Sequence, residues 1–383
     1  MTIKKSLQSK KPGSAMALAL LVVVILCVMG TGLLSLGLHG RMLASRTAAE
    51  IAARCAADAG LEKALFEMNK KMKIKPWNGN TLPKATDESL VHSDASFAYT
   101  ITDSPDYIYD VDVIGRAGRE TRNISCTFVL VGLFRNAIYA QDSLVLENAF
   151  LVDAYSSEDG PYGGVNALQP TTVATSDPNA VAMGSGVLYG DFLVDYGREL
   201  PAITAPTGSP FNVSMGSIDT NEVDIYFGPA DSGQYDEIKL SKCKLTIDGE
   251  VTLYVTGDFD GKQYSEVEIL PDSSLTLYID GNMNFRNTSS VNALTQDPKM
   301  CQIFGTGEEG QKFVFEQSAV LYGTIYAPNA DITMNNSAEL YGAIICDNAE
   351  VSNSAELHFD ATLLQTSVNE IGAEFVVRNW REE

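Results

Sequence analysis

Residues 14–38 read SAMALALLVVVILCVMGTGLLSLGL, and no charged side chain interrupts them. This run of 25 residues exceeds the roughly 20 that an α-helix needs to cross the hydrocarbon core of a bilayer. Four basic residues and no acid precede it: Lys4, Lys5, Lys10 and Lys11. Because positive charge favours the cytoplasmic side of a span, the stretch predicts one transmembrane helix with most of the chain outside the cytoplasm.

The helical pattern continues beyond the apolar run. From Arg41 to Lys73 there is no proline and only one glycine, Gly60, while alanine recurs. A cleaved secretory signal would have a shorter apolar core followed by a small-residue cleavage site. The sequence therefore predicts one helix over residues 14–75, transmembrane over 14–38 and amphipathic beyond, which Pro76 ends.

The rest of the chain is strongly acidic. The net charge is −22, and residues 76–383 hold 15 Lys and Arg against 45 Asp and Glu. Such a surface repels nucleic acid and anionic lipid, so we expect no nucleic-acid partner. We interpret the acids as a solubilising surface, with cation binding as the alternative.

Residues 76–134 predict a small antiparallel β module. Residues 74–94 are polar and turn-rich and are expected to form a loop. Three runs with alternating apolar residues follow, at 96–102, 107–114 and 121–131, and Gly115 and Gly118 predict a hairpin turn between the last two. The module would give the amphipathic half of the helix a sheet to pack on.

Residues 135–366 contain internal repeats. Ser318–Ile325 recurs as Ser337–Ile344, an offset of 19, and a third copy begins at Ser354. Val251–Val255 and Leu275–Ile279 are 24 apart. Short strands at such a period predict a β-solenoid, with a β-sandwich as the alternative. Residues 367–383 are expected to cap the last coil as a strand or short helix. The expected fold class is therefore α+β, mainly β.

No set of residues predicts catalysis. None of the three histidines lies near a nucleophile motif, so we expect no enzyme activity. The six cysteines include no C-x-x-C pair, and no metal site or cofactor is expected. Calcium is the one ion considered, because Asp258-Phe-Asp-Gly261 resembles part of an EF-hand loop, but Val267 stands where that loop needs glutamate. Further acids that are candidates by residue type alone are Asp106, Asp110 and Asp112.

The N-terminal residues resemble those of type IV pilins and pseudopilins, and most closely those of minor pilins of the pilus-assembly type. The likeness rests on Lys10-Lys-Pro-Gly13-Ser14, the apolar run, and Thr47-Ala-Ala-Glu-Ile-Ala52. It implies that a prepilin peptidase cuts after Gly13, removing residues 1–13 as a leader and making Ser14 the new N-terminus. Major pilins carry glutamate at the fifth mature position, where this chain has Leu18, so the resemblance favours a minor or tip subunit.

The resemblance also implies partners and location. The helix from Ser14 to Leu38 would anchor the chain in the inner membrane and then pack among other pilin or pseudopilin subunits. Its C-terminal layout is similar to β-helical domains that follow pilin-like N-termini in bacterial surface proteins and, more loosely, to bactofilin coils. We expect a structural subunit exposed on a pilus or cell surface, with a role in assembly, priming or adhesion to a surface or glycan ligand. The alternatives are a membrane-anchored surface-binding or envelope protein outside any filament and, ranked lower, a carbohydrate-active enzyme.

Overall fold

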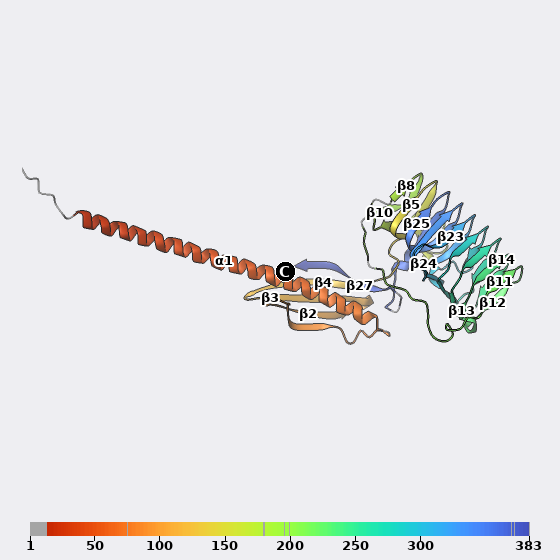
Figure 1. Ribbon diagram of the computed structural model, residues 1–383, viewed down its shortest axis with the longest axis horizontal. Coiled ribbons are helices and arrows are strands. Elements are labelled where there is room, and N and C mark those ends of the chain that lie inside the picture. Colours follow the sequence, from red (N-terminus) through yellow and green to blue (C-terminus); the bar gives the residue numbers. More distant parts are fainter. Residues whose placement is uncertain are drawn as a thin grey trace, which may run out of the picture. The chain divides into compact units, whose positions relative to one another are not determined.

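The computed structural model describes residues 14–74, 76–178, 181–194, 196–198, 200–368, 370 and 372–382. The chain forms two compact units, one of Met1–Val129 with Phe375–Glu383 and one of Leu130–Glu374. The second unit is thus an insertion within the first. The expected fold class is confirmed, since one long helix is followed by strands (Figure 1). The predicted leader, residues 1–13, lies outside the described residues.

The first unit consists of a helix and a five-stranded sheet. Helix α1 spans Ser14–Met72, so it ends three residues before the predicted boundary. The sheet has the order β1-β2-β3-β4-β27. Its strands are β1 (Lys84–Ser89), β2 (Ala95–Ser104), β3 (Ile108–Ala117), β4 (Glu120–Val131) and β27 (Glu374–Glu382). The pairs β1–β2, β2–β3 and β3–β4 are antiparallel, as expected for the module.

The C-terminal half of α1 packs on β2 and β3. Ala53, Ala57 and Ala64 are fully buried because they recur at helical spacing on one face. Small residues allow a close approach: a β-carbon on Gly115 would lie 2.5 Å from the Ala57 backbone nitrogen, and one on Gly60 would lie 2.7 Å from a Val113 methyl. The sheet and helix therefore meet through glycine and alanine.

Two sequence predictions about this region are wrong. Residues 84–89, expected in a loop, form the edge strand β1, whose mainly exposed side chains give no apolar alternation. Residues 367–383 do not cap the last coil, because β27 lies beside β4 in the sheet of the first unit. Asn69 holds it there: its Oδ1 accepts from Phe375 N at 2.7 Å, and its Nδ2 donates to Phe375 O at 3.0 Å. The Phe375 ring packs against Trp77 and Tyr109.

The second unit is a stack of parallel coils. The pairings between its strands are parallel and follow three lines, for example β14–β17, β15–β18 and β16–β19. An antiparallel sandwich lacks this pattern. We call residues 138–360 the coil stack. Its strands are β5 (Ile138–Leu146), β6 (Phe150–Tyr155), β7 (Thr171–Thr175), β8 (Val181–Met183), β9 (Gly186–Leu188), β10 (Gly190–Leu193), β11 (Ile218–Asn221), β12 (Ile225–Phe227), β13 (Gly233–Tyr235), β14 (Ile238–Ser241), β15 (Lys244–Ile247), β16 (Glu250–Val255), β17 (Phe259–Lys262), β18 (Glu266–Ile269), β19 (Ser274–Ile279), β20 (Met283–Arg286), β21 (Ser290–Val291), β22 (Cys301–Gly305), β23 (Gln311–Glu316), β24 (Val320–Asn335), β25 (Glu339–Val351) and β26 (Glu356–Asp360).

The coils do not stack in the order of the sequence. Strands β5 and β6, the first of the unit, pair with β25 and β26, the last. From β10 the chain passes through residues 194–217 to β11 at the opposite end of the stack, and then winds back. In Figure 1 the yellow-green strands β5 and β8 accordingly lie beside the blue strand β25. We call residues 194–217 the connector. Its residues Tyr196, Leu200 and Ile203, with Leu193 before it, pack against buried residues on the outside of the coils.

One corner of the coils repeats a pair of residues with positive φ. Asn336 and Ser337 have φ values of 52° and 63°, and Asn353 and Ser354 have 54° and 62°. Ser337 N donates to Asn353 O in the next coil at 3.1 Å. Asparagine tolerates this left-handed region better than most residues, so the Asn-Ser pairs before each repeated alanine mark where the chain turns. Inside the corners, alternate apolar side chains such as Leu275, Leu277 and Ile279 fill a continuous core.

Candidate functional site

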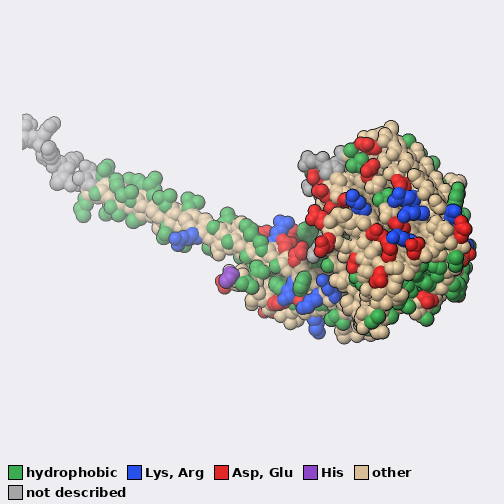
Figure 2. Space-filling model, turned by 45° about the vertical axis from the view of Figure 1, so that its right-hand side comes forward, with side chains coloured by type: hydrophobic (Ala, Val, Ile, Leu, Met, Phe, Trp, Pro, Cys, Tyr) green, Lys and Arg blue, Asp and Glu red, His purple; other side chains and the backbone are tan. Residues whose placement is uncertain are grey.

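The N-terminal half of α1 exposes an apolar surface. Figure 2 shows hydrophobic side chains along this part of the helix. Of the residues predicted to act here, Gly13 lies outside the described residues, and Ser14 is the first residue of α1. Leu18 and Leu38 are 68% and 55% exposed. The helix is long and apolar enough to cross a membrane, with a mean hydropathy of 2.8 over its most apolar stretch.

Exposed apolar residues of α1 continue past the uncharged segment, where they alternate with exposed charged residues. Ile51 and Phe66 are 59% and 63% exposed, although the same half of the helix packs on the sheet. At 100° per residue, Ile51, Cys55 and Phe66 lie on the face opposite to buried Ala53, Ala57 and Ala64. This outward face, Ile51–Cys55–Phe66, also carries the exposed acids Asp58 and Glu62 at the same helical angle. It was not singled out from the sequence, because these acids interrupt its apolar residues.

A buried polar network joins β6 and β26. Asp153 and His358 are neighbours in the parallel pairing and are fully buried. Asp153 Oδ1 lies 2.6 Å from His358 Nδ1, and its Oδ2 accepts from Tyr162 Oη and Leu168 N, both at 2.8 Å. Burial, followed by the hydrogen bond to Asp153, raises the pKa of Tyr162 well above its usual value. One carboxylate therefore holds a loop, residues 156–170, against two coils.

The network has the groups of an Asp–His pair but not the arrangement of a catalytic site. The histidine of a Ser–His–Asp triad needs a nucleophile at its second ring nitrogen. His358 Nε2 instead lies 3.3 Å from Glu356 Oε2 and has no hydrogen-bond partner among the described residues. The ring is covered by Tyr162 and Tyr341, with centroid distances of 3.9 and 4.6 Å. This geometry supports a structural role, in which Asp153 fixes the imidazole orientation.

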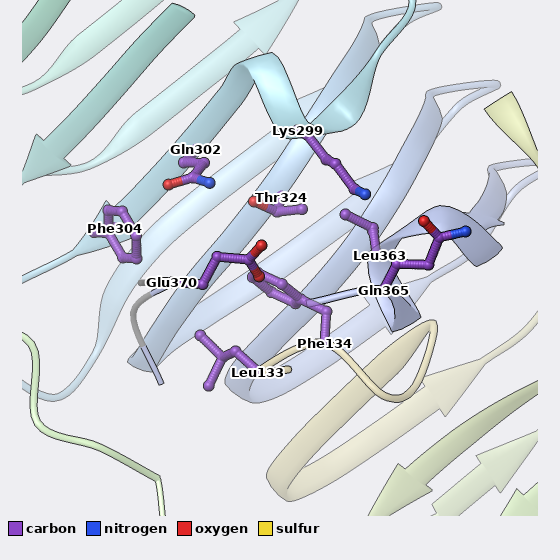
Figure 3. Close-up of a pocket in the computed structure, with 9 residues that line it drawn as sticks. All are labelled: Leu133, Phe134, Lys299, Gln302, Phe304, Thr324, Leu363, Gln365 and Glu370. Carbon is purple, nitrogen blue, oxygen red and sulfur yellow. The ribbon is translucent and has the colours of Figure 1, made fainter. Parts of the chain in front are cut away.

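A small pocket opens on the outside of the coil stack (Figure 3). Its cavity volume is about 80 Å³, and it is lined by Leu133, Phe134, Lys299, Gln302, Phe304, Thr324, Leu363, Gln365 and Glu370. Gln302 and Phe304 come from β22, and Thr324 from its neighbour β24. We call it the β22–β24 pocket. Sequence reasoning missed it because its residues come from four separate stretches of the chain.

The acids considered for calcium already have protein partners or lie apart. Asp258 Oδ1 accepts from Asn282 N and Nδ2 at 2.8 and 3.1 Å, and Asp260 pairs with Lys262 at 2.8 Å. Asp110 and Asp112 lie on β3, and the side chain of Asp106 is outside the described part. No group of three or more His, Cys, Asp or Glu suited to a metal occurs among the described residues. The absence of a cofactor stays a prediction.

An acidic cluster at a corner of the coils predicts a pH effect. Burial, and then the charges of Asp142, Asp331 and Glu309, raise the pKa of Asp347. A raised pKa in the folded state gives stability below the unfolded pKa of about 3.9 that is lost as pH rises through the folded pKa. We expect Asp347→Asn to raise the thermal midpoint at pH 7 and to change nothing near pH 3. The free energy of unfolding at pH 7 should rise by less than about 1 kcal/mol, because the group is partly exposed.

Thermal unfolding across this pH range measures the effect. The control is Asp191→Asn, since Asp191 is an exposed acid on β10. A lower midpoint for Asp347→Asn at pH 7 would show that the hydrogen bond from Asn348 Nδ2 to Asp347 Oδ2, at 3.1 Å, outweighs the unfavourable charges and burial.

Comparisons with known proteins add little to the geometry. A family model described as a domain of unknown function, DUF7305, matches residues 216–366. The match covers the coils that follow one another in sequence, from β11 onward. No curated protein matches. Among solved structures, the competence-associated pilin ComZ from Thermus thermophilus aligns over 88% of this chain and 97% of that chain, at 13% identity and a TM-score of 0.23. A TM-score this low does not establish a shared fold.

Proposed function

We propose that this chain is a minor pilin-like subunit that enters a type IV pilus or pseudopilus through α1 and displays the coil stack. The observation that carries the proposal is the outward face of α1, because its apolar residues continue beyond the segment that a membrane would cover. A simple anchor needs only about 20 apolar residues. Exposed Ile51 and Phe66 are better explained by a neighbouring helix that covers them, since burying each would contribute about 1.5–3 kcal/mol.

The N-terminal sequence supports the same proposal. Cleavage after Gly13 would leave Ser14 at the start of α1. At the fifth mature position, Leu18 offers no carboxylate to a neighbouring subunit's N-terminal amine. An unpaired carboxylate in lipid is costly, whereas leucine is compatible with a site where no such pairing is made. We therefore propose a minor or tip position, with the chain held in the inner membrane before assembly and its remaining residues outside the cytoplasm.

The coil stack would serve assembly, priming or adhesion and not catalysis. Its one buried Asp–His pair has the structural arrangement described above. The second unit, counted over residues 130–374, holds 35 acidic and nine basic residues, which would keep it soluble when displayed. The competing proposal, an anchored surface protein outside any filament, gives α1 no neighbouring helix.

A charged substitution on the outward face separates the two proposals. We expect Phe66→Glu to lower the amount of the protein in sheared surface filaments at least about tenfold, because an unpaired charge in a helix interface costs more than 1.4 kcal/mol. Quantitative immunoblotting of filament and membrane fractions from the native host measures the change. The amount of the protein in the membrane fraction should stay at the wild-type level, since Phe66 lies outside the membrane-spanning segment.

The matched control is Val91→Glu, the same chemical change at a side chain that is 78% exposed in a loop of the first unit. It should enter filaments normally. Mass spectrometry of the mature N-terminus provides the second readout, with Ser14 expected as the first residue. Equal filament levels for Phe66→Glu and wild type, or a wild-type protein confined to the membrane with an intact leader, would contradict the proposal.

A further inference from the structure

The β22–β24 pocket contains polar groups that the fold does not use. The Thr324 hydroxyl, the Gln302 amide and the Lys299 ammonium group make no hydrogen bond to a described residue. The described side-chain atoms that are buried without a partner do not include the Thr324 hydroxyl, so solvent or a ligand can reach it. In Figure 3 these three side chains lie along the β22 and β24 side of the cavity.

The rest of the lining combines apolar and aromatic side chains with the polar Gln365 and Glu370. Leu133 and Phe134 come from the segment before β5, and Leu363 from the turn after β26. The Phe134 ring lies in the middle of the view in Figure 3, between Leu133 and Glu370. Glu370 itself is held by Thr366 Oγ1 at 2.6 Å and Ser367 N at 3.0 Å. The pocket thus sets hydrogen-bonding side chains across from a phenyl ring.

The ligand that fits this lining has hydroxyls on its edge and an apolar face. A pyranose ring meets both conditions: its hydroxyls donate and accept hydrogen bonds, and its C–H face packs on aromatic rings. An anion is disfavoured, because one lysine faces the pocket in a unit with 35 acids and nine basic residues. We propose that the β22–β24 pocket binds a neutral saccharide, with Thr324 and Gln302 contacting its hydroxyls and Phe134 its apolar face.

The size of the pocket limits the affinity. A cavity of about 80 Å³ lies well below the 300 Å³ at which drug-sized ligand pockets begin. It would take the edge of one ring, such as a terminal or branching unit, with a dissociation constant of about 1 mM or weaker. Binding does not depend on the filament proposal.

Saturation-transfer difference NMR tests the proposal with the full chain in lipid nanodiscs. The probes are glucose and N-acetylglucosamine, each at about 1–10 mM to match weak binding. Saturation should reach the ring protons of at least one sugar with the wild-type protein. Thr324→Val, which replaces the hydroxyl with a methyl group of similar size, should reduce the signal at least about fivefold, and Gln302→Met should also reduce it.

The matched control is Thr276→Val. Thr276 pairs with Gln302 in the preceding coil but does not line the pocket, so this variant should give the wild-type signal. Thermal unfolding of each variant confirms that the coil stack remains folded. Three results would overturn the proposal: no transfer to either sugar, equal transfer with wild type and Thr324→Val, or transfer to acetate with none to the sugars.

Discussion

Replacing Gly115 by alanine is expected to destabilise the first unit by about 3 kcal/mol. The new β-carbon would overlap the Ala53 carbonyl oxygen and lie 2.5 Å from the Ala57 nitrogen and 2.9 Å from the Ala57 β-carbon. Two of these three atoms belong to the helix backbone, so no side-chain rotation relieves the contact. Helix α1 would have to move away from β3, which would open the packing around Gly60 as well.

Hydrogen exchange of the full chain in nanodiscs measures this effect by segment. We expect faster exchange over β2, β3 and the packed half of α1, and unchanged exchange in the coil stack, because the latter is a separate compact unit. Gly79→Ala is the control, since a β-carbon there would meet its nearest neighbour, Trp77 Nε1, at 3.6 Å. Wild-type exchange in Gly115→Ala would mean that the helix does not rest on β3 as closely as the structure shows.

The parts of the fold that the sequence predicted are encoded locally. The absence of proline and charge over residues 14–38 predicts a helix whatever the remaining chain does. The repeat offsets equal the pairing register: Leu321 pairs with Leu340, 19 residues on, and Val251 with Leu275, 24 residues on. Identical residues in adjacent coils face the same neighbours, so repetition carries the register within the sequence.

The sequence predictions that were wrong concern features that depend on contacts between residues far apart in the chain. Nothing near Phe375 indicates that it will lie between Trp77 and Tyr109, or that Asn69 will pair with its backbone. The order of the coils is equally non-local, since Ile138 of β5 pairs with Ile344 of β25, more than half the chain away. The offset of 19 also does not hold along the whole coil. Leu321 pairs with Leu340, but Ile332 pairs with Ala349, because the register shifts between Ala327 and Asp331.

The same distinction applies to the candidate sites. The processing and membrane residues, Gly13, Ser14, Leu18 and Leu38, follow from a continuous stretch and could be proposed at once. The β22–β24 pocket joins Phe134 to Thr324, and the buried network joins Asp153 to His358, 205 positions apart. Asp153 alternates with apolar residues as any surface residue of a strand would. Only the loop over it, which carries Tyr162, shows that it is buried.

The second large effect is expected at this network: Asp153→Ala should lower the stability of the coil stack by about 3–5 kcal/mol. The substitution leaves three donors without an acceptor: His358 Nδ1, which is buried, and Tyr162 Oη and Leu168 N, which are partly buried. Each unsatisfied donor costs about 1–3 kcal/mol. Because two of the donors belong to the loop over residues 156–170, that loop should detach first.

Thermal unfolding and limited proteolysis of the full chain measure the two consequences. Asp153→Ala should unfold at a lower temperature, and its first cleavage should fall within residues 156–170. Asp191→Ala, an exposed acid on β10 of the same unit, should behave as wild type. Stability equal to wild type in Asp153→Ala would show that water or a rearranged loop satisfies the three donors.

A double variant separates two effects on stability: the loss of the Asp153 carboxylate and the presence of hydrogen-bond donors without an acceptor. Asp153→Leu with His358→Leu removes the acceptor and one donor together and fills the space with apolar atoms, so it should recover part of the lost stability. Recovery will be incomplete, because Tyr162 and Leu168 still lack an acceptor. If Asp153 acts mainly by holding the loop, proteolysis within residues 156–170 should remain fast in the double variant even where the unfolding temperature rises.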